Sequence, residues 1–249
     1  SSNVTSENSY KQDSLVAEER VNALNRFLSS VIRDLERGLY ISSYRAIFSE
    51  VNYVTEIKGD FINDPEQVFI ELFLNGTIEG ESNNSIWMID NTFLNWTEKI
   101  KSYAKDLDVE LEIIVNDVSL YQKNPWFITI KINTTITLTD LRGFADWNLT
   151  NIAIANMKVE GLEDPLYQVS SRGKAYNFVS FANSTDFIDQ DDDNNTAVLM
   201  NHTLKMRYIH TNISPSYLMR LTNDQGVSEC CGIESLIDAD YLQAKGIFF

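Results

Sequence analysis

The clearest hydrophobic pattern in the chain is a strict alternation in its middle. From Phe127 to Thr139, isoleucine or leucine alternates with threonine, lysine or asparagine, which is the period of a half-buried β-strand. The stretches 109–115 and 151–160 alternate similarly, and Asn124-Pro125 and the turn 140–146 separate the three stretches. Because parallel neighbours need long crossovers, these short breaks predict antiparallel strands.

Two other stretches carry a helical period. Apolar residues recur at heptad-like spacing between Ser14 and Val54, which predicts a long helix bent near Gly38. This helix either lies on the domain's own sheet or forms a coiled coil with another chain. The residues of its stripe are Val21, Leu24, Leu28, Val31 and Leu35. A second helix is predicted over 92–107, with an inward stripe of Phe93, Trp96, Ile100, Tyr103 and Leu107.

Shorter patterns complete the predicted fold. We expect strands at 67–74, 85–89, 176–181 and 204–209, and a short helix between Thr196 and Leu204. The predicted class is α+β: a long N-terminal helix packed on an antiparallel β-sheet, followed by an irregular C-terminal third. Residues 1–13 would form a flexible or partner-bound arm, 14–54 the helix and 55–249 a single extracellular α+β domain.

The charge balance excludes one class of partner. The chain has 36 acidic and 20 basic residues and a formal net charge of −16. Such a surface repels the phosphate backbone that nucleic-acid-binding proteins must neutralise. No stretch approaches the roughly 20 apolar residues of a membrane span. The sequence therefore predicts no nucleic-acid partner and no membrane span in this chain.

Asn-x-Ser/Thr acceptors for N-linked glycans are unusually dense, at ten positions where composition alone predicts about four. Asparagine, serine and threonine also populate turns, which produces accidental acceptors. However, Asn133 falls on the polar face of its strand and Asn95 on the outward face of its helix. We therefore predict N-glycosylation, and with it export from the cell. The acceptors are Asn3, Asn75, Asn83, Asn95, Asn133, Asn148, Asn183, Asn194, Asn201 and Asn212.

The chain has two cysteines, Cys230 and Cys231, which are adjacent. In an oxidising compartment they would form a vicinal or an intermolecular disulfide, and otherwise they would be two unbridged buried thiols.

An acidic run supplies the one candidate metal site. Asp189, Asp191, Asp193 and Asn195 alternate as the first oxygen ligands of a calcium loop do. However, Asn194 stands where such a loop has glycine, and Met200 where it has a bidentate glutamate. The run is therefore either a calcium site or a solvated acidic loop, and no other cofactor is implied.

Catalytic signatures are scarce. The motifs of serine hydrolases, zinc proteases and nucleotide-binding loops are absent, and only His202 and His210 offer imidazole chemistry. We therefore do not expect an enzyme. The four tryptophans, Trp87, Trp96, Trp126 and Trp147, are predicted to pack in the core rather than stack on sugars. The Phe248-Phe249 end would dock in the core or on a neighbouring subunit.

Four segments resemble uncharacterised archaeal exported proteins: 137–147, 159–167 (Val-Glu-Gly-Leu-Glu-Asp-Pro-Leu-Tyr), 214–221 (Ser-Pro-Ser-Tyr-Leu-Met-Arg-Leu) and 230–236 (Cys-Cys-Gly-Ile-Glu-Ser-Leu). The resemblance implies a pilin-like architecture, in which an amino-terminal membrane helix precedes an extracellular domain. It implies no active site.

Together these observations favour a secreted, N-glycosylated structural protein of the cell surface. It would be a subunit of a filament, pilus-like or sheath assembly, with itself or other cell-surface proteins as partners. The alternatives are an extracellular adhesin or carbohydrate-binding module and, third, an extracellular hydrolase.

Overall fold

The computed structural model describes residues 2–81, 86–174, 177–182, 205 and 207–235, with side chains from Gln12 onward. Its elements, in chain order, are α1 (Ser2–Asn52), the π-helix η1 (Tyr53–Lys58), α2 (Pro65–Asn75), the 3-10 helix η3 (Ile86–Met88), α3 (Phe93–Lys105), β1 (Val109–Asn124), β2 (Phe127–Asp140), β3 (Asp146–Lys158), α4 (Pro165–Ser170), β4 (Tyr208–His210), α6 (Tyr217–Arg220) and β5 (Ile233–Ser235).

The three long strands form one antiparallel sheet in the order β1-β2-β3. Their register places Ile136 of β2 between Ile113 of β1 and Leu149 of β3. A bulge between Val115 and Asp117 adds one residue to β1. The strands predicted from alternation are confirmed, and buried and more exposed residues alternate along β2, as a pleated strand requires.

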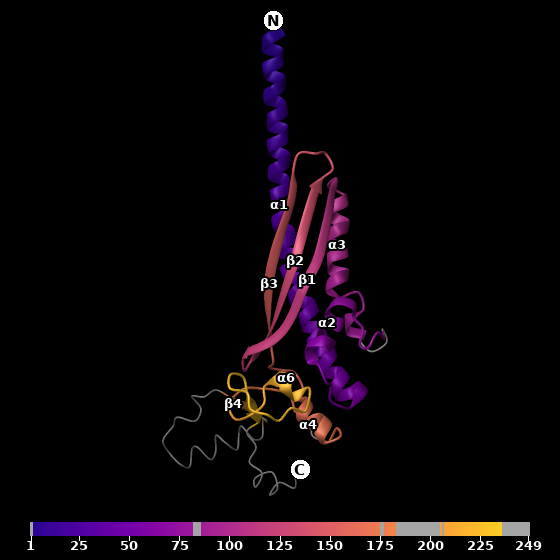
Figure 1. Ribbon diagram of the computed structural model, residues 1–249, viewed down its shortest axis with the longest axis vertical. Helices are drawn as coiled ribbons and strands as arrows, with labels where there is room; N and C mark the ends of the chain where they lie inside the picture. Colours follow the sequence, from indigo (N-terminus) through magenta and orange to yellow (C-terminus); the bar gives the residue numbers. More distant parts are fainter. Residues whose placement is uncertain (1, 82–85, 175–176, 183–204, 206, 236–249) are drawn as a thin grey trace, which may run out of the picture.

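Helices α1, α2 and α3 cover one face of this sheet, and no described helix covers the opposite face (Figure 1). The stripe of α1 is buried, with Leu24 and Val31 each 1% exposed, and it belongs to the same core as Ile130 and Ile136 of β2. The long helix thus lies on its own sheet, and an α+β fold is confirmed.

The prediction of a strand at 67–74 is wrong, because this segment is the helix α2. Asp64 caps its first turn by accepting a hydrogen bond from the Gln67 amide, Pro65 occupies the first turn, and Gly76 ends the helix in the left-handed conformation. These are standard helix start and stop signals. The apolar residues are buried at helical rather than alternating spacing: Phe69, Leu72 and Phe73.

Two smaller strand predictions also fail. Residues 86–88 form η3 instead of a strand, and residues 177–182 make only isolated bridges, Glu163 with Phe178 and Phe181 with Tyr208. The predicted helix between Thr196 and Leu204 lies outside the described residues.

Helix α3 is confirmed, but its expected inward stripe is partly wrong. Tyr103 is 67% and Leu107 42% exposed. Thr97 and Ala104 are buried in addition to Phe93 and Ile100.

Helix α1 departs from the prediction in two ways. It begins at Ser2, so the residues expected to form an arm are helical from there. It also continues through Gly38 without a break. The glycine instead admits Trp96 of α3, because a Cβ atom at residue 38 would lie 2.3 Å from Trp96 Cδ1.

The C-terminal elements α4, β4, α6 and β5 gather at the end of the sheet opposite the N-terminus (Figure 1). We call these four elements, with their connecting residues from 159 to 235 that are described, the base. Its only sheet among the described residues is the short pair β4-β5, which agrees with the predicted irregular third.

Candidate functional site

Helix α1 extends well beyond the sheet at its N-terminal end (Figure 1). Its first buried apolar residue among those with described side chains is Leu24. The part before the sheet, Ser2–Glu19, would span about 27 Å at 1.5 Å per residue. We call Ser2–Glu19 the projecting segment.

Arg20 fixes the point at which the projecting segment leaves the body. Its Nη2 donates to Asp140 Oδ1 at 2.7 Å and to the Leu107 carbonyl at 2.7 Å. Asp140 also accepts from the amides of Arg142 and Phe144. The hydrogen bonds from Arg20 lead the interactions that hold the pKa of Asp140 below its ordinary value. One side chain thus joins α1 to the ends of α3 and β2.

Leu15, in the projecting segment, faces away from the helix stripe that the sheet covers, and its neighbour Val16 lies about 80° from Leu24 around the helix axis. Leu15 and Val16 are 60% and 53% exposed. Leu15 lies about two and a half helical turns before Leu24, at 3.6 residues per turn, and therefore points to the opposite side. The protein's own sheet would not reach Leu15 even if it were longer.

Five glycan acceptors have described side chains, and they are accessible to different degrees. Asn75, Asn148 and Asn212 are exposed, and Asn95 and Asn133 are half-buried. Asn95 is less outward than predicted because its Oδ1 accepts from Thr92 in the capping box of α3. Its Nδ2, the atom that carries a glycan, takes no part in those bonds. The backbone of Asn3 lies in α1; Asn83, Asn183, Asn194 and Asn201 lie outside the described residues.

Two acceptors share the uncovered face of the sheet. The pairing of Asn133 with Ile152 and of Asn148 with Thr137 places both asparagines on this face, on neighbouring strands. Ile114, Ile152 and Ile154 are exposed there as well, at 46%, 56% and 58%. This outer face therefore combines apolar side chains with two attachment points for glycans.

Cys230 and Cys231 are joined to each other by a disulfide, with their sulfur atoms 2.08 Å apart. Cys230 is exposed and Cys231 is buried. Of the alternatives left open by the sequence, this arrangement is the vicinal one, and it leaves neither thiol for a bond to another chain.

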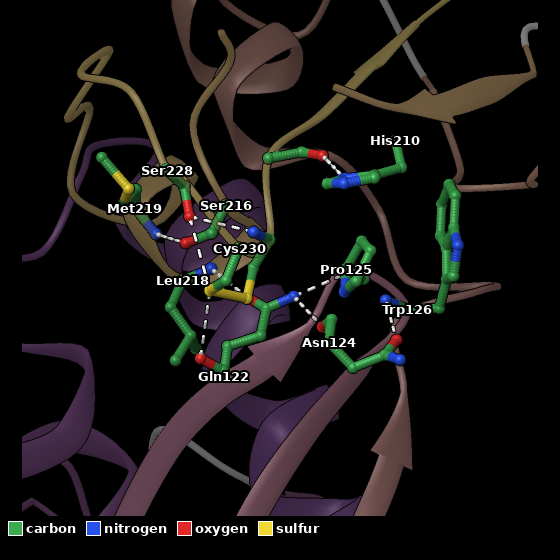
Figure 2. The surroundings of a disulfide bond; sticks show 12 residues. Gln122, Asn124, Pro125, Trp126, His210, Ser216, Leu218, Met219, Ser228 and Cys230 are labelled. Atoms are coloured by element: carbon green, nitrogen blue, oxygen red, sulfur yellow. Dashed lines mark hydrogen bonds between the residues drawn. A yellow bond between two sulfur atoms is a disulfide. The ribbon is translucent and has the colours of Figure 1, made fainter. Parts of the chain in front are cut away.

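The disulfide lies where the base meets the end of β1 (Figure 2). Cys230 Sγ is 3.7 Å from the Gln122 carbonyl oxygen, and Gln122 Oε1 accepts from the Leu218 amide at 3.4 Å. The Cys231 amide donates to Ser228 Oγ at 3.2 Å. The next residue must be glycine, because a Cβ atom on Gly232 would lie 2.2 Å from the Thr211 carbonyl oxygen. The pair thus helps to seat the base on the sheet.

A buried ionic cluster, which the sequence did not predict, holds the base together. Arg220 Nη1 donates to Asp164 Oδ2 at 2.7 Å, and both side chains are fully buried. Tyr208 donates to the same oxygen at 2.7 Å, and Arg220 also reaches Glu234 and the Ile233 carbonyl. Burial would lower the pKa of Arg220, but the carboxylates of Asp164 and Glu234 raise it above its ordinary value.

The ionic cluster has a structural rather than a catalytic geometry. Asp164, Tyr208 and Arg220 are each 0% exposed, so no substrate reaches them. The cluster joins three segments distant in the sequence, 159–167, 214–221 and 230–236, through Asp164, Arg220 and Glu234. The signal in the sequence was the arginine within the apolar run Tyr-Leu-Met-Arg-Leu, since a buried charge needs a partner.

The calcium prediction at Asp189, Asp191, Asp193 and Asn195 lies outside the described residues. Within the described ranges, no three histidine, cysteine, aspartate or glutamate side chains gather as a metal site would require. No helix in the same ranges is both long and apolar enough to cross a membrane.

Three of the four tryptophans pack against the core, whereas the sequence predicted a core role for all four. Trp96, Trp126 and Trp147 pack against the core, as expected. Trp87 is 43% exposed and lies beside Tyr44, which is 53% exposed. The prediction of a core role for Trp87 is therefore wrong.

Comparison with known proteins adds no relative from which a role could be transferred. The chain matches no protein-family model, no curated protein and no solved structure. Its function must therefore be argued from these surfaces, of which the projecting segment is the most distinctive.

Proposed function

We propose that this protein is a structural subunit of an extracellular, N-glycosylated assembly, and that the projecting segment of α1 binds neighbouring copies. The exposed pair Leu15 and Val16 on a helix that extends past the body carries this proposal. Its role is mechanical, and no catalytic step is assigned to it.

The projecting segment has little helix stability of its own. Ser2–Glu19 is rich in serine and asparagine, whose helix propensity is modest, so local preference stabilises this part of α1 only weakly. Packing of an apolar face usually supplies the missing stability. The body cannot supply it, since Leu15 points away from the sheet. A second copy of the chain would supply this packing.

The glycan acceptors support an extracellular setting for the assembly. Asn148, on the outer face of the sheet, is exposed, and so are Asn75 at the end of α2 and Asn212 in the base. Their positions leave the projecting segment between Lys11 and Glu19 without an acceptor. Glycans on the body would thus restrict contacts between copies to the helix.

Electron microscopy and light scattering of the protein, produced in a host that attaches N-glycans, test the proposal. The native chain is expected to form multi-subunit particles. The double variant Leu15→Ser, Val16→Ser should be monomeric, because it removes the apolar face without changing the net charge.

The matched control replaces two apolar residues of the base that are more exposed than Leu15 and Val16, Ile213→Ser and Val227→Ser, which are 77% and 61% exposed in the native chain. This control should assemble normally. A monomeric native protein, or assembly that survives the Leu15, Val16 replacement, would refute the proposal.

A further inference from the structure

An aromatic hollow lies between the middle of α1 and η3. It has a volume of about 350 Å³ and is lined by Tyr44, Arg45, Phe48 and Trp87. Tyr44 and Phe48 follow one another by one helical turn on α1, and Trp87 faces them from η3. The exposed rings of Trp87 and Tyr44 thus both line the hollow.

Contacts among Arg45, Phe48 and Trp87 hold three of the four lining residues in place before any ligand arrives. The rings of Phe48 and Trp87 meet edge to face, with centroids 5.2 Å apart and planes at 84°. Arg45 Nη1 donates to the Trp87 carbonyl at 3.2 Å. Met88, the last residue of η3, is buried, and Ser42 Oγ donates to the Asn91 carbonyl at 2.9 Å. A preformed site loses little conformational entropy when it binds.

The dimensions favour a small ligand over a protein partner. A stable protein interface takes roughly 20–30 residues from each side. The four lining residues and the nearby exposed side chains Tyr40, Ile86 and Ile89 fall well short of that number. A volume of about 350 Å³ is at the lower end of the roughly 300–1,000 Å³ typical of small-molecule sites.

The chemistry of the lining selects the ligand. Exposed tryptophan and tyrosine rings pack against the C–H face of a pyranose ring, and their polar atoms remain available for hydroxyl groups. Arg45 is the one charged residue among the four lining side chains, and a planar guanidinium pairs with a carboxylate by two parallel hydrogen bonds. We propose that the hollow binds an acidic sugar, a uronic acid residue of an oligosaccharide.

In this arrangement the pyranose ring stacks on Trp87 or Tyr44, and the carboxylate of the sugar meets Arg45. The inference does not depend on self-assembly, because all four lining residues belong to one chain. It also assigns ligand binding to Trp87, which the sequence pattern had placed in the core.

The experiment is calorimetric titration of the full chain with trigalacturonate and, separately, with cellotriose. Trigalacturonate is expected to bind at least tenfold more tightly than the neutral sugar. Trp87→Ala should weaken binding of trigalacturonate more than tenfold, and Trp87→Phe, which keeps a ring, less than that. Arg45→Gln should abolish the preference for the acidic sugar.

Tyr103→Ala is the matched control, because it removes an exposed aromatic side chain from α3 outside the hollow. Its affinity for trigalacturonate should equal that of the native chain. Absence of binding at millimolar sugar, equal binding of the two sugars, or native affinity in both Trp87→Ala and Arg45→Gln would each overturn the assignment.

Discussion

At the scale of single residues, Gly38 shows how packing reverses a local preference. Glycine in the middle of a helix costs about 1 kcal/mol relative to alanine. In α1 this cost is offset because the absent side chain lets Trp96 approach and donate its Nε1 hydrogen to the Asp34 carbonyl at 2.7 Å. The sequence suggested a bend at this position; its role is close contact between α1 and α3.

We predict that Gly38→Ala destabilises the protein by about 1–3 kcal/mol, the usual cost of overpacking a tight contact, although alanine is the better helix former. Chemical denaturation measures this change. Asn25→Ala, at an exposed position of the same helix, should be neutral or slightly stabilising. An increase in stability in both variants would contradict the close contact at Gly38.

Glu50 is a second residue whose environment decides its chemistry. It is 1% exposed on α1, and its Oε1 has no hydrogen-bond partner in the part of the chain that is described. Burial, and then the negative charge of Asp64, holds the pKa of Glu50 well above its ordinary value. The folded protein thus keeps a proton that the unfolded chain releases.

This raised pKa fixes the sign of a pH effect. The contribution of Glu50 to the free energy of unfolding is largest below the pKa that this group has in the unfolded chain, near 4.5. It decreases as the pH rises towards the pKa in the folded protein, by up to about 1.4 kcal/mol per pH unit. Glu50→Gln should therefore gain stability over the native protein between pH 4.5 and 7. Denaturation curves across this range measure the difference. For Glu36→Gln, at an exposed position, the difference in stability from the native protein should not change with pH. A difference that does not change with pH for Glu50→Gln would refute the prediction.

At the scale of elements, alternation was a dependable signal and short apolar runs were not. Strand β2 alternates over its whole length, so its two faces were evident in the sequence. The run that forms α2 is too short and too apolar for periodicity to separate helix from strand. The helix is indicated by its start and stop signals, Asp64, Pro65 and Gly76, and not by its hydrophobic pattern.

The base elements are held together by a buried ion pair in addition to apolar packing, in which Tyr217, Leu221 and Ile233 are each at most 1% exposed. They are short, and Arg220 connects α6 to α4 through Asp164 and to β5 through Glu234. Breaking a buried ion pair leaves an uncompensated charge, which costs about 3–5 kcal/mol.

Arg220→Met should therefore destabilise the protein by about 3 kcal/mol or more, because it leaves Asp164 buried without its cation. Thermal and chemical unfolding measure the loss. Arg26→Met, at an exposed position of α1, should change stability by less than 0.5 kcal/mol. Equal effects of the two replacements would contradict a structural role for the ionic cluster.

At the scale of the whole molecule, one face of the sheet is packed under helices and the other is open. The open face carries three exposed isoleucines and the acceptors Asn133 and Asn148. Large exposed apolar patches promote association. Glycans at these two positions would cover the patch, while the part of the projecting segment from Lys11 to Glu19, which has no acceptor, would stay free.

We predict that Asn133→Gln and Asn148→Gln each remove the mass of one glycan from protein made in a glycosylating host, and that the double variant aggregates more readily. Intact-mass analysis and size-exclusion chromatography are the measurements. Asn156→Gln, on the same face but outside an acceptor motif, should leave the mass of the attached glycans unchanged. Unchanged glycan mass in both acceptor variants would show that these sites are not used.

The sequence by itself determined the α+β class, the three strands and the buried stripe of α1. These follow from periodic local patterns, in which the spacing of apolar residues along the chain indicates which face of a helix or strand is buried. The helical state of α2 was also encoded locally, in its caps Asp64 and Gly76, but not in its hydrophobic period. Tertiary structure decided the rest: the contact of Gly38 with Trp96, the pairing of Asp164 with Arg220 and the exposure of Trp87. Each of these depends on residues distant along the chain, about which a hydrophobic period carries no information.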